Sequence, residues 1–202
     1  MSLEKNKQKT KSLVMTALFA AIMIVLQYLP IPPIGGLVGL NFSLVPLVLG
    51  AVLFGPLYGA VLGAIMGAVI VTQIIMMPHI AGNLAVGMYT MNPVVTIALC
   101  LIKTSVAGAV SGLVAKYFTK VKRTVAVIIA SALCPIINTG IFLTGLCGIF
   151  SDVLVANTPA GYTPMMFVLI FIVLCNFVPE LIINIVASPI IVRVSETVKK
   201  KV

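Results

Sequence analysis

The sequence contains few charged side chains, a single histidine and no tryptophan. Charged residues make up 8% of its 202 residues, whereas apolar residues make up 61%. A soluble domain averages about 25% charged and about 45–50% apolar residues, and a soluble chain of this length has too much surface to hide the excess. The composition therefore excludes a soluble enzyme, a nucleic-acid-binding domain and a disordered chain. It favours a polytopic membrane protein embedded in the lipid bilayer.

Catalytic and metal-binding motifs are also lacking. The chain has no P-loop, no G-x-S-x-G, no H-E-x-x-H and no C-x-x-C among its four cysteines. The sequence therefore predicts no ATP hydrolysis of its own, no cofactor and no metal centre. The two ionisable residues deep in the predicted spans are too few for a proton relay. These absences argue against a membrane enzyme and a self-contained secondary transporter, which remain the alternative functions.

Long apolar runs predict an all-α membrane protein. A helix needs about 20 residues to cross a bilayer, so we predict six transmembrane helices in one integral membrane domain over residues 1–202. Twelve of the thirteen basic residues lie in three flanks, at residues 5–11, 116–123 and 193–201. With six spans, all three flanks and both termini lie on the cytoplasmic side, as positive residues prefer. The predicted spans are about residues 12–29, 42–54, 56–77, 93–118, 124–150 and 164–194, and residues 78–92 and 152–162 are predicted to be outer loops.

Small residues recur at a spacing of four in several spans. Glycines occupy every fourth position from residue 55 to residue 67, the fourth span carries Gly108 and Gly112, and the first span carries Ala17 and Ala21. This spacing places small residues on one helix face, where another backbone can approach closely. The pattern indicates either packing within the bundle or a docking face for a partner.

Spans four to six contain polar side chains, whereas spans one to three contain little beyond Gln27 and Gln73. Lys103 follows Pro93 by ten residues, about 15 Å along a helix, which places it near the middle of the hydrocarbon layer. Glu180 is the only acidic residue deep in a span. An ionisable group at this depth usually faces a partner or a cavity. The two residues either form a structural ion pair or contact a polar substrate, and both can hold.

Prolines within the last two spans mark the same region. Pro135 and Pro179 each free a backbone carbonyl, which is tolerated where a helix lines a cavity or where neighbours supply donors. The nearby asparagines can donate and accept hydrogen bonds, either between helices or to a ligand. The candidate substrate-binding residues are Lys103, Asn138, Asn176, Glu180, Asn184, Asn92 and Tyr89.

Three segments together resemble a known family. A lysine-rich start leads into the helix that carries Ala17 and Ala21, a proline-rich loop follows at residues 30–36, and residues 54–60 have the sequence Phe-Gly-Pro-Leu-Tyr-Gly-Ala. The chain resembles the substrate-binding S component of energy-coupling factor (ECF) vitamin transporters over essentially its whole length. The turn at residues 54–60 is the most specific part of the resemblance.

The resemblance implies a division of labour. In that family the S component binds a vitamin or related small molecule from outside, and it associates with a membrane T component and two cytoplasmic ATPases. Ala17 and Ala21 match the A-x-x-x-A motif that docks on the T component, and ATP hydrolysis by the partners is thought to topple the S component in the membrane. The substrate pocket is expected on the outer side, between the loop after the first span and spans four to six. The chain would then be a multi-pass protein of the bacterial cytoplasmic membrane.

The substrate is only partly constrained by the sequence. Thiamine-binding members tend to be rich in tryptophan, which this chain lacks. A buried lysine such as Lys103 suits an anionic group, so pantothenate is the first candidate, followed by riboflavin or folate. The sequence leaves open the oligomeric state and whether the ATPase module is dedicated or shared. Flat vitamins need aromatic stacking partners, for which the candidates are Tyr89, Phe142, Tyr162, Phe167 and Phe171.

Overall fold

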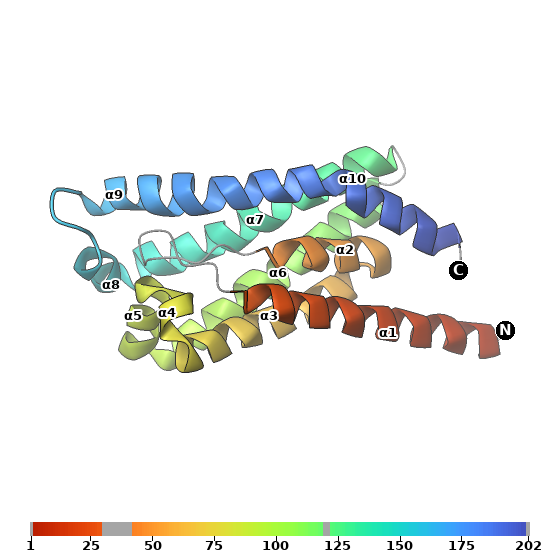
Figure 1. The fold of residues 1–202 in the computed structure, drawn as a ribbon, viewed down its shortest axis with the longest axis horizontal. Helices are drawn as coiled ribbons and strands as arrows, with labels where there is room; N and C mark the ends of the chain where they lie inside the picture. The colour runs from red at the N-terminus through yellow and green to blue at the C-terminus, as the bar shows by residue number, and fades with distance from the viewer. Residues whose placement is uncertain (1, 30–41, 119–121, 201–202) are drawn as a thin grey trace.

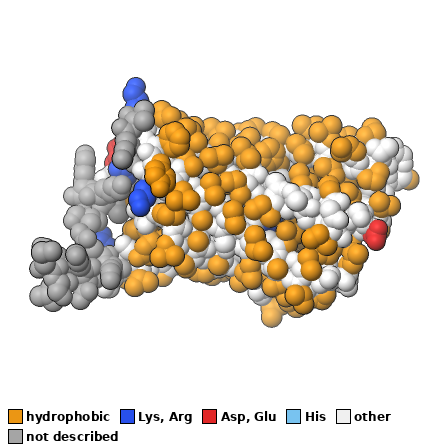
Figure 2. All heavy atoms as spheres, turned by 180° about the vertical axis from the view of Figure 1, so that it is seen from behind, with side chains coloured by type: hydrophobic (Ala, Val, Ile, Leu, Met, Phe, Trp, Pro, Cys, Tyr) orange, Lys and Arg blue, Asp and Glu red, His pale blue; other side chains and the backbone are white. Residues whose placement is uncertain are grey.

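The computed structural model describes residues 2–29, 42–118 and 122–200, and helices make up almost all of these ranges. The long helices run along a common axis, and both termini lie at the same end of the bundle (Figure 1). On the face seen in Figure 2, hydrophobic side chains cover the middle of the molecule and basic side chains gather at the end that carries the termini. The main helices are α1 (Ser2–Gln27), α2 (Leu44–Phe54), α3 (Pro56–Met76), α6 (Pro93–Phe118) and α7 (Arg123–Gly148), followed by a continuous final helix of α9 (Pro164–Phe167), the π-helical segment η1 (Val168–Phe177) and α10 (Val178–Lys200).

Five helices in the described part of the chain are long and apolar enough to cross a membrane. They are α1, α3, α6, α7 and the final helix, which correspond to five of the six predicted spans. The other predicted span is α2, which has only 11 residues and therefore extends about 16 Å. The helical bundle is confirmed, whereas six crossings and a cytoplasmic position for both termini remain predictions.

The two predicted outer loops are wrong in part, because both contain short helices. Residues 78–92 include α4 (Pro78–Ala81) and α5 (Asn83–Met91), which are separated by Gly82 at φ 88°. Residues 152–162 overlap α8 (Ser151–Ala156). Leu84 and Met88, four residues apart on one face of α5, are both buried. Their burial stabilises a helix in a segment that looks polar when only its average composition is considered.

Helices α3 and α6 touch through their backbones. A Cβ atom added to Gly59 would overlap the carbonyl of Gly108, and one added to Gly108 would overlap the carbonyl of Gly59. A Cβ atom on Gly63 would overlap the backbone of Thr104 in the same way. The glycine face of α3 is therefore used inside the bundle. Of the two interpretations of this face, packing is confirmed, and α3 offers no glycine docking surface at these positions.

Apolar side chains form two separate cores at different levels of the bundle. The first, which we call the α2 core, lies around α2 and includes Phe19, Leu47, Leu62, Val127 and Ile191. The second, which we call the α5 core, lies around α5 and α8 and consists of Leu84, Met88, Leu146, Phe150, Val153, Leu154, Phe167 and Ile172. The interval between the two cores falls within α6, α7 and the final helix.

A small polar network joins α1, α2 and α3. The Gln27 side chain donates to Gln73 Oε1 at 2.8 Å, and Gln73 Nε2 donates to the Gln27 carbonyl at 2.6 Å. The Ser43 hydroxyl donates to Gln27 Oε1 at 2.6 Å. The two glutamines that looked isolated in the sequence thus satisfy each other, which removes the cost of burying Gln73.

Pro189 interrupts the hydrogen bonding of α10, and Ser188 compensates for it. Proline has no N–H group, so the carbonyl four residues earlier, on Ile185, loses its helical donor. The Ser188 hydroxyl donates to that carbonyl at 2.7 Å.

We therefore predict that Ser188→Ala lowers the free energy of unfolding by about 1 kcal/mol, because the Ile185 carbonyl loses the donor of a partly buried hydrogen bond. The loss should shrink in a Pro189→Ala background, where the restored backbone N–H can reach Ile185. A double-mutant cycle of unfolding in detergent micelles measures this difference. Equal losses in the two backgrounds would show that Ser188 does not compensate for the proline.

Candidate functional site

Lys103 is buried on α6 at the boundary between the two cores. Leu99, one turn earlier, packs against the α5 core, and Ala107, one turn later, belongs to the α2 core. Because residues four apart share a helix face, Lys103 lies on the same face as these apolar neighbours, and its side chain is only 7% exposed. Its ammonium nitrogen lies 5.0 Å from the centroid of the Phe142 ring on α7. The face of an aromatic ring attracts such a charge, so Phe142 stabilises the buried lysine.

Helix α7 also carries a polar residue between the two cores. Cys134 belongs to the α2 core, Phe142 packs against the α5 core, and Asn138 lies midway between them at a spacing of four residues. The Asn138 side chain is 2% exposed. Pro135 lies within the same helix, one turn from Asn138, as the sequence predicted. The amide of Asn138 is therefore at the level of the bundle where the apolar packing is interrupted.

The final helix carries three polar residues in this interval. Ile172 belongs to the α5 core and Ile191 to the α2 core, and between them Asn176, Glu180 and Asn184 follow one another at a spacing of four. All three are buried. Helix α7 packs against both α6 and α10 (Figure 1), so the three helices bring polar side chains into one buried layer. We call this layer the polar belt and define it as Lys103, Asn138, Asn176, Glu180 and Asn184.

Two amide oxygens of the polar belt, Oδ1 of Asn138 and Oδ1 of Asn184, are buried without a hydrogen-bond donor among the residues that the structure describes. The other end of the Asn184 amide donates to the Glu180 carbonyl at 2.8 Å, which fixes the orientation of the amide. The buried Ser131 hydroxyl, two turns from Asn138 on α7, is also without a partner there. Each such group costs about 1–3 kcal/mol, and nothing in the sequence distinguished Ser131 from other small residues.

The segment that carries Asn176 is π-helical. In η1 the backbone N–H of Val178 bonds to the carbonyl of Val173, five residues earlier, and Pro179 follows directly. Helices of this kind are rare and are frequent at functional sites. The sequence predicted a break near Pro179 but not its form. The wider π turns set the positions from which Asn176 and Glu180 project.

Lys103 and Glu180 are the two charged members of the polar belt. Lys103 lies at the Phe142 ring on α7, and Glu180 is buried on the final helix. A direct ion pair between them stays a prediction, as does contact of either group with a substrate.

Asn92 and Tyr89 lie outside the polar belt. Asn92 is exposed, and its Oδ1 accepts a hydrogen bond from the Val95 backbone at 3.2 Å, which caps the start of α6. Asn92 is eleven residues before Lys103, about 17 Å along the helix. Tyr89 is half-buried on α5, which packs against α6. The capping bond gives Asn92 a structural role, and substrate contact by these two residues remains a prediction.

The aromatic candidates separate into two groups. Phe142 lies at Lys103, as described above. Phe171 contacts Tyr162, with ring centroids 5.7 Å apart, and Phe167, with centroids 5.3 Å apart. Phe167 is fully buried in the α5 core, whereas Tyr162 is exposed. The second group therefore stabilises the start of the final helix, and Phe142 is the aromatic side chain nearest the polar belt by the contacts described.

Ala17 and Ala21 are exposed on α1, whereas Phe19, Ala20 and Met23 are buried against the bundle. Large apolar side chains beside the two alanines are exposed as well, among them Leu18 at 51%. Helix α1 therefore has an apolar face, interrupted by small residues, that the described part of the chain does not cover. Lipid or a partner helix can pack against it.

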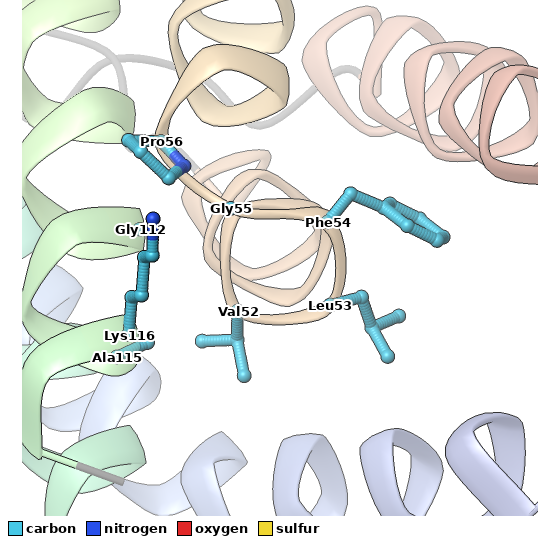
Figure 3. Close-up of a pocket in the computed structure, with 8 residues that line it drawn as sticks. All are labelled: Val52, Leu53, Phe54, Gly55, Pro56, Gly112, Ala115 and Lys116. Carbon is cyan, nitrogen blue, oxygen red and sulfur yellow. The ribbon is translucent and has the colours of Figure 1, made fainter. Parts of the chain in front are cut away.

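A cavity of about 270 Å³ lies away from the polar belt, between the α2–α3 turn and the end of α6. Figure 3 shows Lys116 extending from α6 toward Pro56 at this turn. Lys116 is thirteen residues beyond Lys103, about 20 Å along α6. None of the residues predicted to bind substrate lines this cavity, which is bounded by Val52, Leu53, Phe54, Gly55, Pro56, Gly112, Ala115 and Lys116.

Long apolar helices around a buried polar layer define a multi-pass membrane protein with a polar interior. A sequence profile of the family described as ECF transporter, substrate-specific component, matches residues 11–192. The chain belongs to this family, and the resemblance seen in the sequence is confirmed. Its members are transporter subunits rather than enzymes, and membership implies association with a T component and ATPases. No curated protein matches the chain.

Proposed function

We propose that this chain captures a small vitamin-like molecule from outside the cell and delivers it inward as the S subunit of an ECF-type importer in the bacterial cytoplasmic membrane. The T component and two ATPases would supply the energy. The polar belt is the observation that carries this proposal. It places one buried cation and three amides between two apolar cores, an arrangement that is costly unless the groups serve one another or a ligand.

The charge at Lys103 favours an anionic substrate group. Phe142 is its neighbour on α7. The face of the ring attracts the lysine charge, but it has no oxygen lone pairs to accept hydrogen bonds from the lysine N–H groups. A substrate carboxylate could therefore bind the lysine N–H groups directly. This reasoning keeps pantothenate as the first candidate, ahead of riboflavin, which has no carboxylate, and it also fits folate, which has two.

The experiment that tests this function begins with the purified chain. Mass spectrometry of small molecules retained through purification should identify a tightly bound solute. The chain expressed with its partners should co-purify with a larger membrane protein and two ATPases. Uptake by the chain alone in sealed vesicles would instead support a self-contained transporter and contradict the proposal.

Docking on α1 leads to a separate prediction. Ala17→Trp or Ala21→Trp should abolish co-purification of the T component and ATPases, because a large side chain prevents a partner helix from approaching a small-residue face. Ligand binding by the isolated chain should not change, since both alanines point away from the bundle.

Ala98→Trp is the matched control for this prediction. Ala98 is an exposed alanine on α6, so the variant adds the same bulk to a different outward face and should retain the complex. Retention of the complex in the α1 variants, or its equal loss in Ala98→Trp, would contradict docking through Ala17 and Ala21.

A further inference from the structure

We infer that the polar belt selects a ligand with two unlike parts: an anionic group held by Lys103, and hydrogen-bond donors such as hydroxyl, amide N–H or ammonium groups held by Asn138 and Asn184. This inference rests on the proposed function, because it assumes that the polar belt binds the substrate. It goes further by stating which chemical groups the substrate carries and which residues distinguish them.

Lys103 forms the donor side of the belt. A lysine ammonium has three N–H donors and no acceptor. The Phe142 ring stabilises its charge at 5.0 Å without being a conventional acceptor. A group that complements Lys103 must therefore bring negative charge or oxygen lone pairs.

Asn138 and Asn184 form the acceptor side. Their Oδ1 atoms are buried without donors in the described part of the chain, and the two side chains are 2% and 1% exposed. The Asn184 amide cannot simply be reversed, because its nitrogen donates to the Glu180 carbonyl at 2.8 Å. Its oxygen is thereby held as an acceptor. The unmatched atoms on these two residues are thus oxygens, and only a donor can satisfy them.

The location of these oxygens connects them to the same ligand. Asn138 lies one turn from Phe142 on α7, and Phe142 contacts Lys103. Asn184 lies on α10, which packs against α7. The donor side and the acceptor side therefore lie on three helices of which α7 packs against the other two, between the α2 core and the α5 core. A carboxylic acid that also carries hydroxyl or amide groups fits both sides, whereas a cation without an anionic group offers nothing to Lys103.

The first test is a binding panel of pantothenate, riboflavin, folate and thiamine, measured by thermal shift of the purified chain, with mass spectrometry of any retained solute. We expect the compound that binds to contain an anionic group and at least two O–H or N–H donors, and we expect thiamine not to bind. If no compound binds and none is retained, the proposed function fails and the inference fails with it.

The second test uses variants of the acceptor side with whichever compound binds. Asn138→Leu and Asn184→Leu should each weaken its affinity about tenfold or more, because a ligand donor loses its buried acceptor. Thr104→Val is the matched control. Thr104 is equally buried, but its hydroxyl donates to the Cys100 carbonyl of its own helix, and its backbone faces Gly63 on α3. The affinity of the Thr104→Val variant for the bound compound should stay within about twofold of the wild-type value.

A methylated form of the bound compound separates ligand recognition from a structural role. Methylation of its hydroxyl or N–H donors should weaken binding to the wild type about tenfold, but should have little further effect on the asparagine variants. Ligand-free Asn138→Leu should melt at or above the wild-type temperature, since it removes an unmatched polar atom. If affinity is unchanged while ligand-free stability falls, the oxygen holds a structural water, and the inference is overturned although the function stands. Equal losses on methylation in wild type and variants would overturn it as well.

Discussion

Replacing Lys103 with alanine is expected to abolish substrate binding by the purified chain. The side chain is buried between the α2 core and the α5 core, and removal of one partner from a buried charged contact costs about 3–5 kcal/mol, which corresponds to roughly 100-fold to 1,000-fold or more in affinity. Isothermal titration with the bound compound measures this loss. Unchanged affinity would remove Lys103 from the site.

Two further variants show whether the lost binding is due to the charge. Lys103→Arg keeps a cation and should retain part of the affinity, although its planar fork cannot reproduce the geometry of the ammonium. Phe142→Leu removes the ring that contacts Lys103 and should have the smaller effect of a lost cation–π contact, about 0.5–2 kcal/mol. If Phe142→Leu is as damaging as Lys103→Ala, the pair acts as a packing unit rather than as an anion site.

The location of the polar belt could be predicted from the sequence because each of its residues lies far inside an apolar run. The distance from Pro93 places Lys103 in the interior of span four, and the positions beside Pro135 and Pro179 point to Asn138 and Glu180; all three are buried. The spacing of four also explains why Lys103 and Asn138 share faces with core residues on either side. Hydrophobic length and periodicity are sufficient for this part of the fold.

The details that determine chemistry could not be predicted in this way. An α-helix and a π-helix have nearly the same hydropathy pattern, so η1 left no signal apart from Pro179. The unmatched oxygens of Asn138 and Asn184 depend on which neighbours fail to supply a donor, which is a property of the packed state. The pairing of Gln27 with Gln73 joins residues 46 positions apart, and no local pattern contains it.

Gly63→Ala is expected to lower both the stability of the bundle and the affinity for substrate, because α3 and α6 touch beside Lys103. A Cβ atom at Gly63 would overlap the backbone of Thr104, the residue directly after Lys103. Backbone atoms cannot rotate away as a side chain does, so the helices must separate. The cost should be about 3 kcal/mol of unfolding free energy, at the upper end for overpacking. Because the separation occurs next to Lys103, substrate affinity should also fall among the molecules that remain folded. Unfolding in mixed micelles, followed by circular dichroism, measures the first effect, and titration measures the second.

Gly140→Ala and Gly59→Ala are the controls for this prediction. Gly140 is exposed on α7 and no atom lies within 4 Å of a Cβ atom placed there, so its alanine variant should be as stable as the wild type or slightly more stable, as expected when alanine replaces glycine in a helix. Gly59→Ala would overlap Gly108, which is five residues beyond Lys103, and should lower stability with a smaller effect on affinity. If Gly63→Ala and Gly140→Ala unfold alike, α3 and α6 are not in backbone contact. If Gly59→Ala and Gly63→Ala weaken binding equally, the position of Lys103 does not depend on the local approach of α3.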